Sequence, residues 1–193
     1  FHAALHVLAT PLLTIGGRVV LVSPFEPGEY LRLAQRLGVT VMFMVPAMYQ
    51  VLVGHPDFAA ADLGRVRWAI CGGAPCPPSV ARAMLDHGIP FRQGYVISEA
   101  GVNCFAIDLE ESALHPESVG RPMSHVQVEI RRPDGSACAP DEVGELTLAG
   151  EALCSGYLAH GDEWQSVCRD GWFWTGDLAE RDNEDRYYIR GRR

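Results

Sequence analysis

The stretch VRWAICGGAPCPPSVARAMLDHGIPFRQGYVI, residues 66–97, contains two apolar runs that are separated by a segment of helical composition. The runs at 66–73 and 90–97 have the apolar and aromatic character of strands, and residues 77–88 predict a helix between them. Apolar strands that alternate with helices are typical of a parallel sheet covered on both faces. The stretch therefore predicts an α/β fold with a mostly parallel sheet.

The segments before this stretch repeat the same alternation. Residues 18–25 and 39–46 are further apolar runs that predict strands, and residues 26–38 predict an amphipathic helix that stops at a glycine. A proline at position 46 predicts a second, short helix that ends by Gly54. We expect these elements to belong to one α/β subdomain that covers about residues 1–105.

The pattern of polar and apolar residues changes after about residue 105. Polar and apolar residues alternate around the turn signals Pro133-Asp134-Gly135 and Asp141-Glu142, which is typical of hairpins. Residues 170–193 predict another pair of hairpins, with Asp170-Gly171 and Asn183 in the turns. We expect residues 106–193 to form a β-rich subdomain of the same domain.

Composition and charge exclude several classes of protein. The chain has 193 residues, of which 48% are hydrophobic and 21% charged, so it is globular. No apolar run reaches the roughly 20 residues that span a bilayer, and the first residues lack the basic start of a signal peptide. We therefore predict a cytoplasmic protein without a membrane span. Residues 101–193 carry nine arginines against eighteen acids, which disfavours nucleic-acid binding.

The chain contains no lysine, so it cannot supply a Schiff base or a Walker A lysine. Its six cysteines include no C-x-x-C pair, and we expect reduced thiols rather than a zinc site or disulfides. His2 and His6 have the spacing of a helical metal site, but the glutamate of the zincin pattern is missing. Packing or pocket-lining histidines are the better interpretation.

Two nucleophile patterns are also weak. Ser98 lacks the flanking glycines of a hydrolase elbow, because Val96 and Ala100 occupy those positions. Cys71 precedes Gly72-Gly73, but no neighbour that would activate a thiol is evident.

Polar residues at the predicted strand ends are better candidates for ligand binding. Ser98 and Glu99 suit either a phosphate with its Mg²⁺ or a helix N-cap, and both interpretations remain open on this segment alone. Asp177 follows Thr-Gly after an aromatic strand, where a carboxylate can accept the hydroxyls of a ribose. Arg192 can donate to ribose or phosphate oxygens. The glycines of CGGAP, residues 71–75, allow close approach of a flat ligand.

The order of these motifs is more specific than any one of them. The chain contains FH, GGAP, QGYVISEAG, SVGRP, GELTLAG, SGY, DGWFWTGDLAERD and YYIRGRR in this sequence. In that order they resemble the AMP-forming acyl-CoA synthetase and adenylate-forming ligase family, over essentially all 193 residues. The resemblance implies a two-step ligase that activates a carboxylic acid with ATP and Mg²⁺ and then transfers the acyl group to coenzyme A.

The resemblance also implies roles for individual residues. It assigns Ser98 to the α-phosphate and Glu99 to Mg²⁺ as the catalytic pair, and Asp177 to the ribose. The nucleotide-binding set that it implies is Gly72, Gly73, Ala74, Pro75, Gln93, Gly94, Tyr95, Ser98, Asp177 and Arg192. The acyl pocket that it implies contains His2, Val96, Ala100 and Gly101.

The sequence departs from the family pattern at Val96, where glycine is usual, so we expect a narrowed or altered acyl pocket. The phosphate loop and the C-terminal lid of the family, each with a lysine, are expected outside these residues, and the chain is expected to be inactive alone. Two alternatives remain: an adenylation domain that loads a carrier protein, and a non-catalytic nucleotide- or acyl-binding module. The sequence identifies neither the acid nor the oligomeric state.

Overall fold

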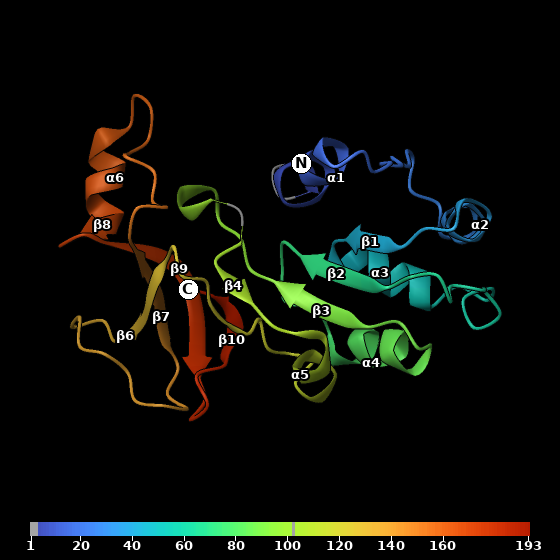
Figure 1. The fold of residues 1–193 in the computed structure, drawn as a ribbon. Coiled ribbons are helices and arrows are strands. Elements are labelled where there is room, and N and C mark those ends of the chain that lie inside the picture. The colour runs from blue at the N-terminus through green and yellow to red at the C-terminus, as the bar shows by residue number, and fades with distance from the viewer. Residues whose placement is uncertain (1–3, 102) are drawn as a thin grey trace. The chain divides into compact units, whose positions relative to one another are not determined.

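The computed structural model describes residues 4–101 and 103–193. The chain divides into two compact units, coloured from blue to green and from green to red in Figure 1. The first unit runs to Gly94 and also includes Asp108–Glu117, and the second contains Tyr95–Ile107 and Ser118–Arg193. The α/β class with an antiparallel β-rich part is confirmed.

The first unit is built on a parallel sheet in the order β1-β2-β3. Its strands are β1 (Val41–Met44), β2 (Trp68–Gly72) and β3 (Phe91–Gly94). The strand predicted at 90–97 is shorter than expected. The main-chain oxygen of Tyr95 accepts a hydrogen bond from the N–H of Cys104, so the chain leaves the parallel ladder there.

Three helices of the first unit lie where the sequence predicts helices: α2 (Pro27–Leu37), α3 (Pro46–Val53) and α4 (Pro78–Asp86). A further helix of this unit is α5 (Leu109–Leu114). The side chain of Glu26 caps α2, and Gly38 ends it in the left-handed conformation at φ 61°. Tyr49, Phe91 and Met84 are fully buried in the core of this unit. The helix α5 was not predicted.

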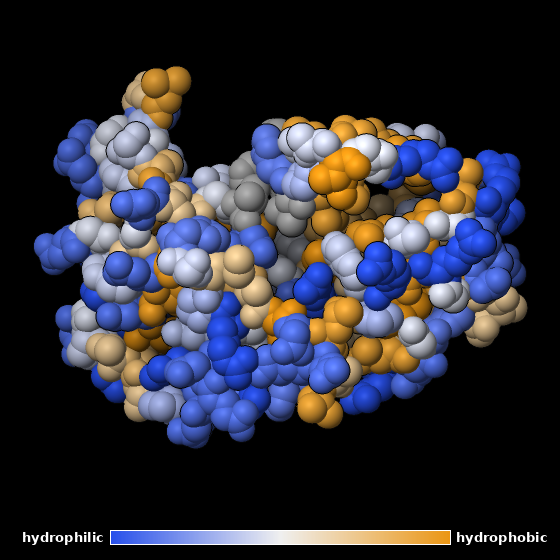
Figure 2. Space-filling view, viewed as in Figure 1, coloured by the Kyte–Doolittle hydropathy of each residue, from blue (hydrophilic) through white to orange (hydrophobic). Residues whose placement is uncertain are grey.

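The strand predicted at 18–25 is wrong. The described residues before α2 form the short π-helix η1 (Ala4–Ala9) and the short α-helix α1 (Thr10–Thr14), followed by chain that pairs with no strand. Leu21 is 88% exposed, and Figure 2 shows apolar side chains at the surface in this part of the first unit. A strand needs hydrogen bonds to a neighbouring strand, and no strand among the described residues pairs with this segment.

The second unit contains an antiparallel sheet in the order β10-β9-β7-β6, with β8 also paired to β9. The strands are β6 (Gln127–Arg131), β7 (Gly144–Ala149), β8 (Cys168–Arg169), β9 (Trp172–Arg181) and β10 (Tyr187–Arg192). A smaller ladder joins β4 (Phe105–Ala106) to β5 (Arg121–Pro122). The predicted hairpins are therefore confirmed, and Leu146 and Leu148 of β7 are fully buried.

Two short helical elements complete the second unit. The 3₁₀ turn η2 covers Ser98–Ala100, and α6 covers Gly161–Val167, which was not predicted. Throughout the described ranges, the helices are too short or too polar to cross a bilayer.

Candidate functional site

A bulge in β9 organises the candidate site of the second unit. Thr147 pairs with Trp174 and Glu145 with Leu178, so Thr175–Asp177 face a single residue of β7. The hydroxyl of Thr175 donates to the main-chain oxygen of Leu146 at 2.8 Å. Gly176 has φ +76°, a conformation that glycine adopts without cost. Bulges of this kind re-aim side chains next to binding sites.

Glu145 fixes the bulge from the neighbouring strand. Its Oε1 accepts the N–H of Gly176 at 3.0 Å, and its Oε2 accepts from the guanidinium of Arg193 at 2.7 Å. The glutamate is buried in β7, all of whose residues are buried. Sequence reasoning did not single out Glu145, although a carboxylate inside an otherwise apolar strand was a usable signal.

The bulge brings Asp177 together with two other predicted residues. The hydroxyl of Tyr95 donates to Oδ2 of Asp177 at 2.6 Å, and Nη1 of Arg192 lies 3.7 Å from Oδ1. Burial, together with the hydrogen bond to Asp177, raises the pKa of Tyr95, so the phenol remains a donor. The Arg192 side chain is mostly exposed. Asp177 therefore lies between a fixed donor and an exposed guanidinium.

Ser98 and Glu99 lie in η2. The residue at the N-cap position is Ile97, and no side chain caps the turn, so the N-cap interpretation of Ser98 is wrong. The Ser98 residue is exposed. The hydroxyl of Tyr157 donates to Oε1 of Glu99 at 2.6 Å. This hydrogen bond, with a smaller contribution from burial, raises the pKa of Tyr157 to about 12.

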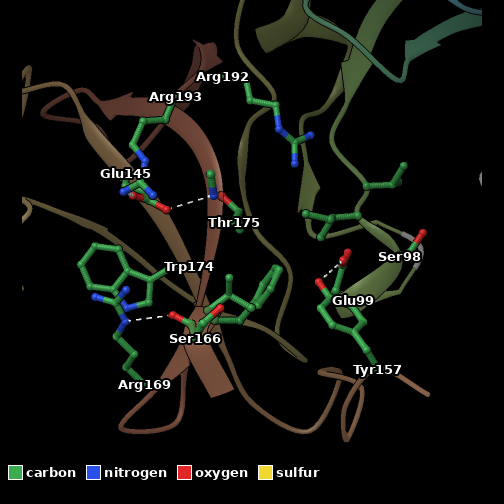
Figure 3. A pocket seen from close by; sticks show the side chains of 15 residues that line it. Ser98, Glu99, Glu145, Tyr157, Ser166, Arg169, Trp174, Thr175, Arg192 and Arg193 are labelled. Carbon is green, nitrogen blue, oxygen red and sulfur yellow. Dashed lines mark hydrogen bonds and ion pairs between the residues drawn. The ribbon is translucent and has the colours of Figure 1, made fainter. Parts of the chain in front are cut away.

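These groups border a pocket of about 680 Å³ that lies within the second unit (Figure 3). In Figure 3, Glu99 and Tyr157 point toward one another on one side, while Glu145 and Arg193 meet on the other. Of the predicted residues, those that line this pocket are Val96, Ser98, Glu99 and Arg192. Tyr95 and Asp177 do not line the pocket. Asp177 lies next to it because it pairs with Arg192, and Tyr95 is bonded to Asp177.

The pocket suits a cation that arrives with phosphates. Among the described residues, no three His, Cys, Asp or Glu side chains group as a metal cage. Mg²⁺ is usually held by one or two carboxylates together with water and substrate phosphates, so a single carboxylate is enough. Glu99 supplies such a carboxylate at the pocket wall. The residues present therefore fit Mg²⁺ bound with a nucleotide.

The remaining predicted nucleotide residues lie in the first unit. Gly72 ends β2, the loop of residues 73–75 follows it, and Gly73 has φ +93°. Gln93, which is buried, accepts the N–H of Cys76 at 2.8 Å and donates to the main-chain oxygen of Pro116 at 2.8 Å. Its amide therefore anchors the loop. Gly94 pairs with Gly72 at the ends of β3 and β2.

The other predicted acyl-pocket residues have different surroundings. Ala100 is buried in the core of the second unit, and Gly101 has φ +78°. His2 lies outside the described residues. The acyl roles of these residues stay predictions.

The structure also argues against Cys71 as a nucleophile. Cys71 is buried, and its hydrogen bond with Cys76, together with burial, raises its pKa. A thiol held in the protonated form is a poor nucleophile. All six cysteines are free.

The structure thus combines a parallel α/β unit with a β unit in which an acidic residue lies at a strand bulge, near a pocket that contains a hydroxyl and a second carboxylate. The chain belongs to the AMP-binding enzyme family, whose sequence profile matches residues 1–158.

Named relatives agree with this assignment. Feruloyl-CoA synthase of Amycolatopsis sp is 37% identical over 190 residues, which cover 98% of this chain and 39% of the relative. The amide bond synthetase McbA of Marinactinospora thermotolerans has a TM-score of 0.84 at 31% identity, over 96% of this chain and 38% of that one. O-succinylbenzoate coenzyme A synthetase of Bacillus subtilis, solved with ATP and magnesium ion, has a TM-score of 0.81 at 26% identity. The match covers 99% of this chain and 39% of that one. The chain thus spans about two fifths of the length of these relatives.

Proposed function

We propose that the protein containing this chain is an acid–thiol ligase that activates a carboxylic acid with ATP and transfers the acyl group to coenzyme A. The observation that carries the proposal is the arrangement around the β9 bulge. There Asp177 contacts Tyr95 and Arg192, and Arg192 borders the pocket that contains Ser98 and Glu99. Membership of the AMP-binding enzyme family, with relatives named as CoA ligases, supports the same activity.

The proposed reaction has two steps. An oxygen of the substrate carboxylate attacks the α-phosphorus of ATP, the bond to pyrophosphate breaks, and an acyl-adenylate forms. The sulfur of coenzyme A then attacks the acyl carbon, and AMP leaves. Steps of this kind depend mainly on positioning and on neutralisation of charge.

The proposed roles follow from the polar groups of the second unit. Asp177 accepts hydrogen bonds from the ribose, and Arg192 is exposed and available to oxygen atoms of the nucleotide. The exposed hydroxyl of Ser98 donates to an α-phosphate oxygen. Glu99 would hold Mg²⁺, which offsets the negative charge of the phosphates when it is bound.

In the first unit, the proposed adenine contacts are Gly72, Gly73, Ala74, Pro75, Gln93 and Gly94. Tyr95, in the second unit, is a further proposed nucleotide contact. The proposal rests on the position of the loop at the end of β2, where ligands of parallel sheets bind. Because the Gln93 amide is bonded to main chain at both ends, its proposed role is to fix the loop rather than to donate to the base. We also propose that the regions 1–105 and 106–193 are subdomains of one AMP-binding domain, that the phosphate loop and lid belong to the longer protein, and that it is cytoplasmic.

Pyrophosphate exchange in the full-length protein tests the adenylation step. A panel of aromatic, medium-chain fatty and dicarboxylic acids identifies the substrate by the acid that supports ATP–pyrophosphate exchange. Glu99→Ala and Asp177→Ala are expected to lower the exchange by at least about 100-fold, as lost electrostatic stabilisation does at other active sites. Exchange at the wild-type rate in either variant would contradict that residue's role.

The acyl pocket is tested at Val96, which lines the pocket where glycine is usual in the family. Val96→Gly removes the side chain and is expected to raise kcat/KM for bulkier acids about 10-fold relative to the smallest acid accepted. An unchanged ranking of the acids would place the acyl group elsewhere.

The acceptor of the second step is tested separately. McbA is named as an amide bond synthetase, so an amine acceptor is a second candidate alongside coenzyme A and a carrier protein. Presenting the acyl-adenylate with each acceptor in turn distinguishes these outcomes. Nucleotide binding without exchange for any acid would favour a non-catalytic module.

A further inference from the structure

The segment between β7 and α6 contains Tyr157, whose side chain contacts the carboxylate proposed to bind Mg²⁺. The Tyr157 hydroxyl donates to Oε1 of Glu99 at 2.6 Å. The N–H of Cys154, in the same segment, donates to the main-chain oxygen of Glu99 at 2.7 Å. The segment therefore holds both the backbone and the side chain of Glu99.

Aromatic packing fixes the position of the Tyr157 ring. It meets Trp164 of α6 edge-on, with centroids 5.4 Å apart, and Trp164 stacks on Phe173 of β9 at 5.4 Å. Phe173 is buried in the antiparallel sheet. The phenol is thus connected to the sheet through rigid contacts rather than carried on an unsupported loop.

The hydrogen bond occupies one oxygen of Glu99. Among the described residues, no donor is assigned to the other oxygen, Oε2, and both Glu99 and Tyr157 line the pocket. A phenol is a neutral donor, so it orients a carboxylate without cancelling its charge. A guanidinium at the same place would do both and would compete with a divalent cation.

We propose that Tyr157 is a positioning residue for Glu99: it holds one carboxylate oxygen so that the other faces the cation that accompanies the ATP phosphates. The proposal rests on the proposed function, because it takes the role of Glu99 from there. It adds a residue that acts on the cation through Glu99 and not by direct contact.

The test measures the thermodynamic coupling between Mg²⁺ and ATP in the full-length protein. Calorimetry gives the Kd of ATP in EDTA and at saturating Mg²⁺, and the ratio of the two constants is the coupling factor. Tyr157→Phe keeps the ring against Trp164 and removes only the hydroxyl. We expect its Kd for ATP in EDTA to stay within twofold of wild type, while the coupling factor falls about 3- to 10-fold, as loss of one hydrogen bond of typical net strength predicts.

Steady-state kinetics should show an effect on the KM for Mg²⁺ but not on kcat. In pyrophosphate exchange, Tyr157→Phe is expected to raise the KM for free Mg²⁺ about 3- to 10-fold and to leave kcat at saturating Mg²⁺ within twofold. Trp164→Leu keeps the hydroxyl but loosens the ring, so it should shift the KM in the same direction by less. Tyr188→Phe is the matched control, because its hydroxyl also donates to a carboxylate, that of Asp182, and it does not line the pocket.

The outcomes distinguish this proposal from the proposed function. If Glu99→Gln abolishes the coupling and Tyr157→Phe leaves it unchanged, the positioning role is overturned and the role of Glu99 stands. If Glu99→Gln also leaves the coupling unchanged, the metal site of the proposed function is wrong. If Tyr157→Phe weakens ATP binding in EDTA as strongly as in Mg²⁺, the residue only supports the pocket, and the proposal fails.

Discussion

Two glycine-containing turns, residues 72–76 in the first unit and 175–177 in the second, are held by different chemistry. The first is anchored by the neutral, buried amide of Gln93, which is bonded to main chain at both ends. The second is anchored by the buried carboxylate of Glu145, which also pairs with the largely exposed guanidinium of Arg193. A neutral anchor is indifferent to salt, whereas an ion pair with one exposed partner is screened by it. The two turns should therefore respond differently to solution conditions.

The largest effect is expected at the neutral anchor. Gln93→Leu has nearly the same size but leaves the buried N–H of Cys76 and the part-buried oxygen of Pro116 without their partner, at about 1–3 kcal/mol each. We expect local stability to fall by about 3 kcal/mol, which is roughly 100-fold faster amide exchange at Cys76. Hydrogen–deuterium exchange on the full-length protein measures this at any ionic strength. Gln50→Leu, on the exposed side of α3, is the control. Unchanged exchange at Cys76 would show that the loop is held by its prolines instead.

A smaller, salt-dependent effect is expected at the charged anchor. Glu145→Ala removes the acceptor of the Gly176 N–H and should cost about 2 kcal/mol, measured as faster exchange of that amide. Glu145→Gln keeps an acceptor, loses the ion pair with Arg193, and should cost less than about 1 kcal/mol. The difference between wild type and Glu145→Gln should shrink as salt rises to about 1 M. Glu180→Gln, which breaks another ion pair of β9, should leave Gly176 unaffected. A salt-independent difference would assign the anchor to the hydrogen bond alone.

The two adjacent glycines of the first turn differ in backbone conformation, because only Gly73 has a positive φ. Gly73 has φ +93°, so Gly73→Ala is expected to cost about 1 kcal/mol and to raise the Kd for ATP about fivefold. A Cβ on Gly72 would meet its neighbours at 3.6 Å, an ordinary contact, so Gly72→Ala should change the Kd less than twofold. Calorimetry with ATP on both full-length variants makes the comparison. Equal effects would indicate that lost space, and not backbone strain, decides the response.

The elements that were predicted correctly have local signals in the sequence. The strand–helix–strand pattern of residues 66–97 and the turn residues Asp170-Gly171 and Asn183 specify structure within a few positions, and each was confirmed. The strand at 18–25 failed for the opposite reason. Its apolar residues favour a strand, but a ladder also needs a partner, and composition does not report whether one is present.

The candidate site was predictable in part. The motif order gave Tyr95, Asp177 and Arg192, which the structure brings together. Glu145 and Tyr157 lie in the motifs GELTLAG and SGY, but the motif order assigned them no role. Their contacts, with residues 31 and 58 positions away, came only from the structure. Such contacts depend on the register of the sheet and on the bulge, which no local pattern specifies.

The smallest expected effect lies in the turn between β9 and β10 and depends on pH. Burial opposes ionisation of Asp182, but the N–H groups of Arg186 and Glu184 and the Arg186 guanidinium outweigh it and lower its pKa. A carboxyl with a lowered pKa stabilises the folded form above its unfolded pKa, and this contribution is lost as pH falls through the folded value. Asp182→Asn should therefore cost about 1 kcal/mol near pH 7 after screening, and less than half of that near pH 3. Amide exchange in the turn, compared between wild type and variant at the same pH, measures it. Asp185→Asn, whose ion pair with Arg181 is exposed, is the control, and a difference between wild type and Asp182→Asn that stays constant with pH would contradict the ionic origin of the effect.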